Sequence, residues 1–436
     1  MTEDAGTGNA VTGNTLTEEW DPGVALDPTA AVDTGCAPFV DGAYVAGGEA
    51  TTAWEPGTGA PLAAVASAGP AEVDAAVAAA RRAQPSWAGL AGAERVRVLL
   101  RVAALVGASA AGLAVLETRG TGRPVRLTRA VDLPAAVAHL RSCAGWADKL
   151  DHAGHGPDPR PAGVIGGAIA DRRPLLAAVR AVAPALAAGN AVVLAPDADA
   201  PLSALALAQL AAEAGLPAGV LNVVPGADLG AHDGLDVVTG AGAAGRGVHV
   251  VHDDAPLDQA VDGVLAALGT DRRVLVAESV ADEFEALLVE RAARLRVGDP
   301  LDRNVDVGPV GTRARRDGAE ALVVAAQDGG ARSVAGPAAP PGRGLFLAPA
   351  VLFDVAPGTP AAEQEITGPV LPVLTFRTPA EAVSLAGAAT TAAVWTDKGS
   401  RALWTAERLR ARVVWVNDVD RWDPAAPAAA LAPFLA

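Results

Sequence analysis

The chain has 436 residues, of which 51% are hydrophobic and only 3% are aromatic. Lys and Arg number 34 against 50 Asp and Glu, so the formal net charge at pH 7 is −16. This length and apolar content can bury more than one core, and we expect two or three domains. An acidic balance without a basic stretch argues against nucleic acid and anionic membranes as partners.

Cysteine and histidine usage predicts neither a disulfide framework nor a metal site. Cys36 and Cys143 are too few and too far apart for either. His152 and His155 lie in a Gly/Pro-rich stretch, which we interpret as a solvated loop rather than a metal pair. No basic segment followed by an apolar core opens the chain, and charged residues interrupt the apolar stretch 164–196. We therefore expect a cytoplasmic protein.

The first 34 residues contain seven acidic residues and no basic residue, which is typical of a flexible acidic arm. Trp20 within it either docks on a surface or faces solvent. After the arm, residues 39–44 resemble a short hairpin whose turn is the Asp-Gly at 41–42. Apolar residues at helical spacing then predict two helices, over 70–87 and 91–116.

A repeated strand–helix pattern occupies most of the remaining chain. Its first part predicts strands over 164–169, 191–194 and 220–224, a strand before 239–240, and helices over 175–188 and 202–214. Gly189-Asn190 is typical of a helix stop. After residue 252 the pattern restarts, with strands over 274–276, 370–376, 394–395 and 413–416 and helices over 282–295, 320–327, 379–386 and 400–409. Such repetition predicts parallel sheets covered by helices on both faces.

Six runs along the chain carry a family resemblance. They are APALAAGNAVVL (183–194), EAGLPAGVLNVVPG (213–226), VGDPLD (297–302), DVGP (306–309), EITGPVLPV (365–373) and VWVN (414–417). In this order they resemble motifs of the aldehyde dehydrogenase superfamily. The resemblance implies an α/β, aldehyde-dehydrogenase-like fold with two Rossmann-like parallel-sheet domains and a reduced oligomerisation element.

This resemblance also implies a division of the chain into four parts. Residues 1–34 are the arm, 35–148 and 161–252 a dinucleotide-binding-like domain, 253–416 a degenerate catalytic-like domain, and 149–160 with 417–436 a vestigial oligomerisation element. The stretch 151–160 is too short for the family's oligomerisation hairpin, and its prolines disfavour sheet pairing. We expect the family's tetramer to be lost.

The family's dinucleotide cleft implies a set of vestigial cofactor residues: Pro196, Gly226, Thr239, Gly240, Gly245 and Glu365. The glycine pattern alone is a weak signal, because close backbone packing would explain it equally well. Ala195 replaces the family's ribose-binding Lys, and Thr367 replaces an aromatic residue. Losing a charged hydrogen-bond partner costs about 1.5–3 kcal/mol. We therefore expect that no cofactor is required and that NAD(P) binds weakly.

The catalytic residues that the resemblance implies are missing. An aldehyde dehydrogenase needs a thiolate nucleophile, an oxyanion donor and a general base. The nucleophile's position falls near Gly269, and no Cys occurs between 144 and 436. Arg172 stands where the family has its oxyanion Asn. The strand that carries the general-base Glu would precede Asp253, but only residues 246–252 lie between Gly245 and that position.

We interpret the chain as a pseudoenzyme that resembles the degenerate second repeat of two-repeat aldehyde dehydrogenases. It would be a structural or regulatory subunit whose partner is an active aldehyde dehydrogenase homologue. One alternative is an NAD(P)- or aldehyde-binding sensor, and another is a divergent NAD(P)-dependent aldehyde oxidoreductase that uses Thr270 or Ser279. The triplets Asp-Arg-Arg at 171–173 and 271–273 either close the old tunnel with ion pairs, bind an anion, or coincide by chance in an Arg-rich chain.

Overall fold

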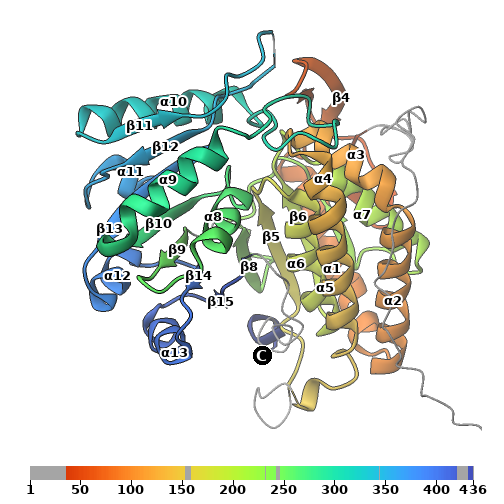
Figure 1. The fold of residues 1–436 in the computed structure, drawn as a ribbon. Helices are drawn as coiled ribbons and strands as arrows, with labels where there is room; N and C mark the ends of the chain where they lie inside the picture. Colours follow the sequence, from red (N-terminus) through yellow and green to blue (C-terminus); the bar gives the residue numbers. More distant parts are fainter. Residues whose placement is uncertain are drawn as a thin grey trace, which may run out of the picture.

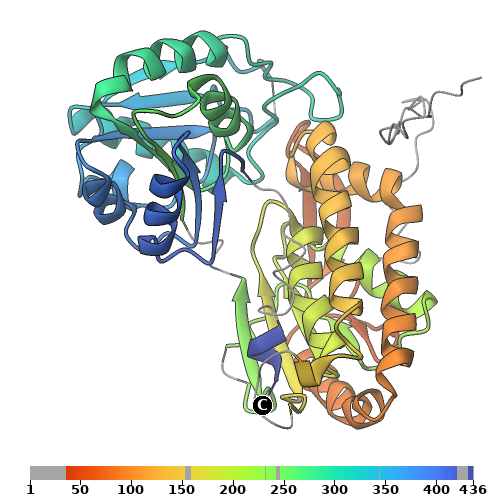
Figure 2. The ribbon, with the colours of Figure 1, turned by 60° about the horizontal axis from the view of Figure 1, so that its bottom comes forward.

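The computed structural model describes residues 36–152, 159–230, 232–241, 246–342, 344–419 and 431–435. Within these ranges the chain forms two α/β units that lie side by side, each built on its own sheet (Figures 1 and 2). The acidic arm with Trp20, the cofactor residue Gly245, His155 and most of the expected oligomerisation element lie outside the described residues.

The first unit is built on a sheet of six strands within the described ranges, in the order β2-β1-β7-β6-β5-β8. These strands are β1 (Phe39–Val40), β2 (Ala43–Tyr44), β5 (Val164–Ile169), β6 (Ala191–Pro196), β7 (Leu221–Val223) and β8 (Val237–Ala241). Strands β5 to β8 pair in parallel, as predicted. The predicted hairpin β1–β2 is also confirmed. Its turn residues Asp41 and Gly42 have φ values of 53° and 83°, as a tight hairpin turn requires.

Helices cover both faces of this sheet. They are α1 (Pro70–Ala88), α2 (Gly92–Ala108), α3 (Ala110–Thr121), α4 (Val125–Leu127), a π-helical turn (Thr128–Asp132), α5 (Leu133–Ala144), α6 (Pro174–Ala187) and α7 (Leu202–Glu213). Along β6, Val193 and Ala195 belong to the core that α1 covers, whereas Val192 and Leu194 belong to the core that α6 and α7 cover. Because successive strand residues point to opposite faces, both faces need apolar residues. This explains the continuous apolar run of β6.

The second unit has seven strands within the described ranges, in the order β11-β12-β13-β10-β9-β14-β15. They are β9 (Gly247–Val251), β10 (Arg272–Ala277), β11 (Arg332–Ala335), β12 (Ala350–Phe353), β13 (Val370–Phe376), β14 (Thr391–Trp395) and β15 (Val413–Val416). All neighbours pair in parallel except β11 with β12. A separate hairpin, β3 (Ala50–Glu55) with β4 (Ala60–Ala66), extends from the first unit.

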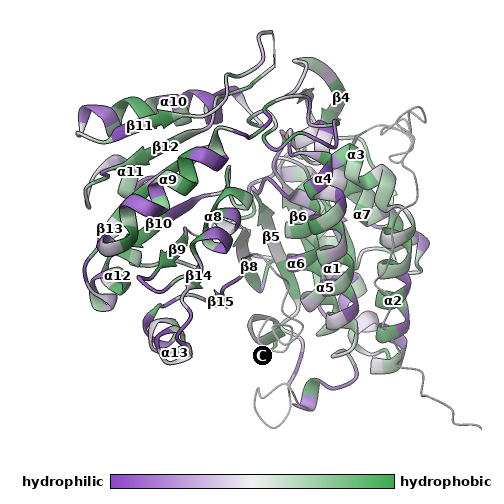
Figure 3. Cartoon of the chain, in the orientation of Figure 1, coloured by the Kyte–Doolittle hydropathy of each residue, from purple (hydrophilic) through white to green (hydrophobic). Residues whose placement is uncertain are grey.

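The helices of the second unit are α8 (Leu257–Ala266), α9 (Ala281–Ala292), α10 (Arg313–Asp328), α11 (Pro360–Glu363), α12 (Pro379–Ala386) and α13 (Gly399–Arg408). Val274 and Val276 of β10 face the core under α8 and α9, whereas Leu275 faces the core under α10 to α12. Helix α10 buries three of its sixteen residues and carries hydrophilic stretches, whereas α6 is dominated by hydrophobic ones (Figure 3).

Strand β9 corrects the expected domain boundary at residue 252. It pairs with β10 and β14 in the second sheet, so the second unit begins before residue 253. The physical reason is that Val248, Val250 and Val251 are buried in the cores of that unit. Strand β8 of the first sheet ends at Ala241, and β9 begins at Gly247. The chain therefore passes from one sheet to the other within residues 242–246, too few for an intervening helix and strand.

Asn190 joins three segments at the base of the first sheet. The preceding Gly189 has φ +91°, which confirms the predicted helix stop after α6. The Asn190 amide donates to the carbonyls of Ala185 and Phe434, at 3.1 and 2.9 Å, and its oxygen accepts from Gly163 at 2.8 Å. Phe434 itself is buried in the core of the first unit. Residues 431–435, part of the expected oligomerisation element, therefore pack against their own chain.

Within the described ranges, no single helix combines the length and the apolar composition needed to cross a membrane. Helices α2 and α3, bent by 71° relative to each other, meet that criterion only as a pair.

Candidate functional site

Three of the cofactor residues expected from the sequence meet at one end of the first sheet. Pro196 ends β6 opposite Ile169 of β5, and Gly240 of β8 lies opposite the neighbouring Ala168. The N–H of Gly226 donates to the carbonyl of Pro196 at 2.9 Å and brings the loop after β7 to the same edge. Ligands of open α/β sheets bind at the carboxyl ends of the strands. This edge is therefore the candidate dinucleotide cleft.

Thr239 and Gly226 shape the floor of this cleft through the backbone. The hydroxyl of Thr239 donates to the carbonyl of Gly166 at 3.2 Å, so it holds β8 against β5. Gly226 has φ +69°, and a Cβ added there would lie 3.2 Å from the Cβ of Ala198. The turn therefore needs glycine for both its conformation and its close packing. Gly245 lies outside the described residues.

Glu365 lies in the second unit, in the segment between α11 and β13. Its side chain is exposed, and within the described part of the chain it makes no hydrogen bond. A carboxylate of this kind can accept hydrogen bonds from ribose hydroxyls. Thr367 instead donates to the carbonyl of Arg315 at 2.8 Å, and Ala195 is buried against α1. The residues present fit a dinucleotide at the backbone floor and at Glu365, without the family's Lys.

Arg172 and Gly269, which the sequence places 97 residues apart, are in contact. Arg172 lies in the turn between β5 and α6, and Gly269 lies in the loop between α8 and β10. The guanidinium donates to the carbonyls of Gly269 and Pro309, each at 3.2 Å. A Cβ added to Gly269 would lie 3.3 Å from the Arg172 Nη1 atom. The guanidinium thus fills the space into which a side chain at position 269 would point.

In the described part of the chain, this guanidinium carries its charge without a carboxylate bound to it. Burial, followed by the neighbouring Arg123 and Arg315, lowers the pKa of Arg172 to about 10, and Asp171 opposes the shift. The group nevertheless keeps its proton at neutral pH. The two carbonyl acceptors supply hydrogen bonds but no countercharge. A small cavity of about 40 Å³ beside it is lined by two arginines, Arg172 and Arg315, and by three aspartates, Asp171, Asp197 and Asp199.

The two Asp-Arg-Arg triplets do not pair with each other. Asp171 lies 3.7 Å from Arg173, and Asp271 lies 3.7 Å from Arg273, so each acid faces a base of its own triplet. Asp271 also accepts a hydrogen bond from the N–H of Ile366 at 3.0 Å. The contact that closes the site is therefore the one from Arg172 to backbone carbonyls, not an ion pair between the triplets.

Both cysteines lie away from this pocket. Cys143 is buried on α5, 3.6 Å from the Nε2 atom of His139, and burial raises the pKa of its thiol to about 12. Burial also raises the pKa of Cys36, whose backbone forms an isolated β-bridge with Val65 of β4. Neither thiol is ionised at neutral pH, so neither has the character of a nucleophile.

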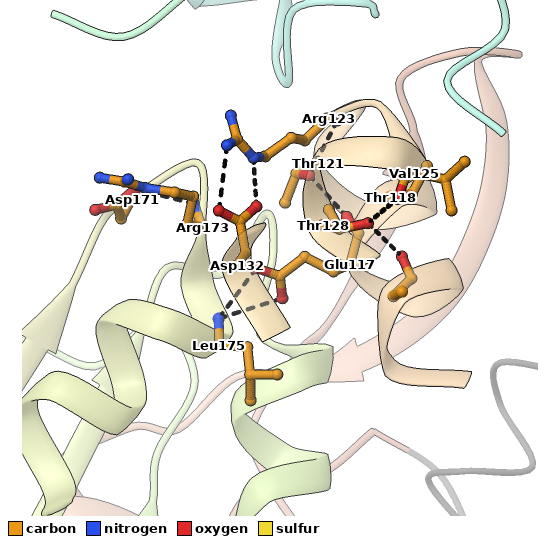
Figure 4. A network of polar contacts seen from close by, with 11 residues as sticks. Glu117, Thr118, Thr121, Arg123, Val125, Thr128, Asp132, Asp171, Arg173 and Leu175 are labelled. Carbon is orange, nitrogen blue, oxygen red and sulfur yellow. Dashed lines mark hydrogen bonds and ion pairs between the residues drawn. The ribbon is translucent and has the colours of Figure 1, made fainter. Parts of the chain in front are cut away.

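A buried polar network next to Arg172 was not predicted from the sequence (Figure 4). The Glu117 carboxylate on α3 accepts from the backbone N–H of Leu175 at 3.2 Å. Beside it, Arg123 forms an ion pair with the buried Asp132. Burial raises the pKa of Glu117 to about 8, Asp132 adds to this, and a hydrogen bond from Ser203 opposes it. The only sequence signal for this network was that Glu117 falls at a helical position that is buried in α3.

Within the described ranges, no group of three or more His, Cys, Asp or Glu side chains is arranged to hold a metal ion.

Comparison with known proteins identifies relatives of this site and fold. The sequence model described as the aldehyde dehydrogenase family matches residues 44–244 and 240–429. The Bacillus subtilis (strain 168) protein named "Putative aldehyde dehydrogenase DhaS" is 31% identical over 444 residues, which cover 89% of each chain. The structure of a Bacillus cereus aldehyde dehydrogenase with NAD+ superposes with a TM-score of 0.85 at 27% identity, covering 96% of this chain and 98% of that one. An indole-3-acetaldehyde dehydrogenase with NAD+ gives a TM-score of 0.83 at 30% identity, covering 94% and 97%.

These comparisons confirm the predicted fold and correct the expectation about the cofactor. We expected that no cofactor is required and that NAD(P) binds weakly. That expectation is wrong, because solved dehydrogenases that share this fold over more than nine-tenths of the chain hold NAD+. The physical reason is that the loss of side chains leaves the backbone floor at Pro196, Gly226 and Gly240 in place.

We predict that Glu117 makes the stability of the protein fall as pH rises. The folded-state pKa of about 8 lies above the ordinary value of 4.5, so the folded chain holds a proton that the unfolded chain releases. Between these two values the free energy of unfolding should decrease by about 1.4 kcal/mol per pH unit from this group. Urea unfolding of Glu117→Gln from pH 5 to 8.5 should show a flatter profile. The exposed Glu94→Gln should keep the wild-type slope, and an unchanged slope in Glu117→Gln would refute the assignment.

We further predict that a thiol introduced at position 269 is activated by Arg172. In Gly269→Cys the adjacent guanidinium should lower the pKa of the new thiol by about 1–3 units, as a close opposite charge does. Alkylation by iodoacetamide across pH 6–9 measures this value. Gly387→Cys is the matched control, because Gly387 also has positive φ and nothing within 4 Å of an added Cβ. Adding Arg172→Met to Gly269→Cys should abolish the shift, and equal thiol pKa values in all three variants would contradict the geometry.

Proposed function

The chain belongs to the aldehyde dehydrogenase family, and from that membership we propose that it binds NAD(P) without oxidising aldehydes through a cysteine thioester. Its role is that of a structural or regulatory subunit for an active homologue. The observation that carries the proposal is the Arg172 guanidinium, which fills the nucleophile's position at Gly269. A positive, hydrogen-bonded group there leaves no side chain to attack a carbonyl.

Two observations support the loss of thioester chemistry. The sequence contains two cysteines, and both are buried in the first unit with raised thiol pKa values. The chain passes from β8 to β9 within residues 242–246, which leaves no place for the Glu-bearing strand. Removing a catalytic nucleophile costs on the order of 10⁶ in turnover. Binding of the dinucleotide does not depend on any of these groups.

NAD(P) binding is supported by the geometry of the cleft and by the relatives that hold NAD+. In this chain the backbone at Pro196 and Gly226 would support the dinucleotide, and the Glu365 carboxylate would accept hydrogen bonds from a ribose. When bound, a nicotinamide supplies a hydride acceptor. The chain's own residues contribute the backbone floor and the carboxylate acceptor.

A partner subunit is supported by the exposed apolar residues on two edge strands. Within the described residues, β8 pairs only with β5, and β15 pairs only with β14. Val238 on β8 is 44% exposed and Val416 on β15 is 45% exposed. An open strand edge with exposed apolar side chains is a ready site for pairing with another chain.

A second candidate is a divergent NAD(P)-dependent aldehyde oxidoreductase. The names of its relatives favour it, since DhaS matches 89% of this chain. Such an enzyme would need another nucleophile. Thr270 follows Gly269, but its hydroxyl donates to the carbonyl of Ala267.

We predict that NAD or NADP raises the melting temperature of the purified chain, while no aldehyde causes NADH or NADPH to form. A ligand at a hundred times its Kd stabilises a protein by about 2.7 kcal/mol. Glu365→Gln should weaken binding by about tenfold in isothermal titration, because one charged acceptor is lost. The exposed Glu407→Gln is the control. Dinucleotide reduction by aldehydes that persists in the Cys36→Ala, Cys143→Ala double variant would favour the oxidoreductase.

We also predict a stable complex with an aldehyde dehydrogenase from the same source. Native mass spectrometry of the protein purified from its source should show a mixed assembly. Val238→Lys should reduce its abundance, because a charge on the strand edge opposes pairing. Val324→Lys, at an exposed position on α10, is the matched control. A chain found only as a homo-oligomer or a monomer would contradict the subunit role and favour a dinucleotide sensor.

A further inference from the structure

A cavity of about 650 Å³ lies between the β3–β4 hairpin and the start of α10. The indole of Trp54, 54% exposed, lines it from the hairpin. Arg313 and Arg316 line it from the first turn of α10. The cavity borders the small one beside Arg172, because Asp199 lines both. It thus combines an uncovered aromatic ring with cationic side chains.

The positive charge at this rim is only partly neutralised. Within the described residues Arg313 forms no ion pair, and Arg316 contacts only Asp317 and Glu320 of its own helix, at 3.0 and 3.9 Å. No acidic residue occupies the first turn of α10 to offset the positive end of the helix dipole. The rim is therefore suited to an acidic segment.

Two acidic residues, Glu55 and Asp199, also line the cavity and could offset the charge of its arginines. Glu55 is paired with Arg119 at 2.8 Å, so its charge is already balanced. Asp199 interacts with Arg315, and burial with the nearby Asp197 raises its pKa. Neither acid neutralises the two arginines on the rim.

We propose that residues 18–21 of this chain, Glu-Glu-Trp-Asp, dock in this cavity. Trp20 lies against Trp54, and the acidic side chains on either side of Trp20 bind Arg313 and Arg316. The segment lies in the first 34 residues, which carry seven acids, no base and one tryptophan. An aromatic anchor flanked by complementary charges is the usual composition of a tight contact.

The connection is long enough for this contact. The described chain begins at Cys36, whose backbone forms an isolated β-bridge with Val65. Val65 in turn pairs with Thr51 on β3. Trp54 lies three residues further along the strand, which is about 10 Å. Trp20 is sixteen residues from Cys36, a span of at most about 50–58 Å. The maximum span of the segment from Trp20 to Cys36 therefore exceeds the distance along β3 to Trp54 several-fold.

A second groove with arginines and a tryptophan is the natural competitor. Trp404, Arg408 and Arg410 line a groove between α12 and α13. There, however, the guanidinium of Arg408 already lies over the Trp404 ring at 4.3 Å. The indole is covered and one arginine is engaged, so this groove offers less to an incoming tryptophan than the cavity at Trp54.

Protection of Glu18 and Glu19 from a glutamate-specific protease tests the docking in the full-length chain. Cleavage after Glu3 in the same sample is the internal reference. The double variant Arg313→Glu, Arg316→Glu should raise the relative cleavage rate at 18–19 by about tenfold, because two surface ion pairs become repulsive. Trp54→Ala and high salt should each raise it as well.

The double variant Arg408→Glu, Arg410→Glu is the matched control and should leave the rate unchanged. If the α10 double variant and Trp54→Ala both cleave at the wild-type rate, the proposal is overturned. Release by the α12–α13 double variant instead would also overturn it and would place the arm in the other groove.

Discussion

The buried guanidinium of Arg172 is the interaction on which the arrangement of the site depends. It joins the turn that opens α6 in the first unit to two loops of the second, through the carbonyls of Gly269 and Pro309. A buried charge is costly unless it is hydrogen-bonded, and removing one side of such a contact costs more than the contact contributes. The loops therefore stay closed over the guanidinium.

Elements whose signals are local could be predicted from the sequence. The β1–β2 hairpin was specified by Asp41-Gly42, and the end of α6 by Gly189-Asn190, because turn and stop chemistry resides in the residues themselves. The continuous apolar run of β6 likewise reflects burial on both faces. Strand β9 was assigned to the wrong domain because an apolar run does not encode which sheet it joins. That choice depends on partners far away in the sequence, β10 and β14.

The candidate site likewise combines residues that the sequence identified with contacts that it did not predict. Arg172 and Gly269 were each identified through motif position, but their contact spans 97 residues, and no local pattern contains it. Glu117 was missed because burial of a helical carboxylate is decided by the helix that packs on it, here α6 through Leu175. The cofactor expectation failed because it treated each missing side chain as an independent loss. Backbone contacts have no sequence signature beyond glycine, so their contribution was undervalued.

The short passage between the sheets limits how this molecule can open. Residues 242–246 link β8 to β9, and the gap from Ala241 to Gly247 spans at most about 20 Å when fully extended. The two units therefore cannot separate by a large translation. Contacts of Arg126 with Val305 and Asp306 also join the two units, so Arg172 is one of several links that hold them together.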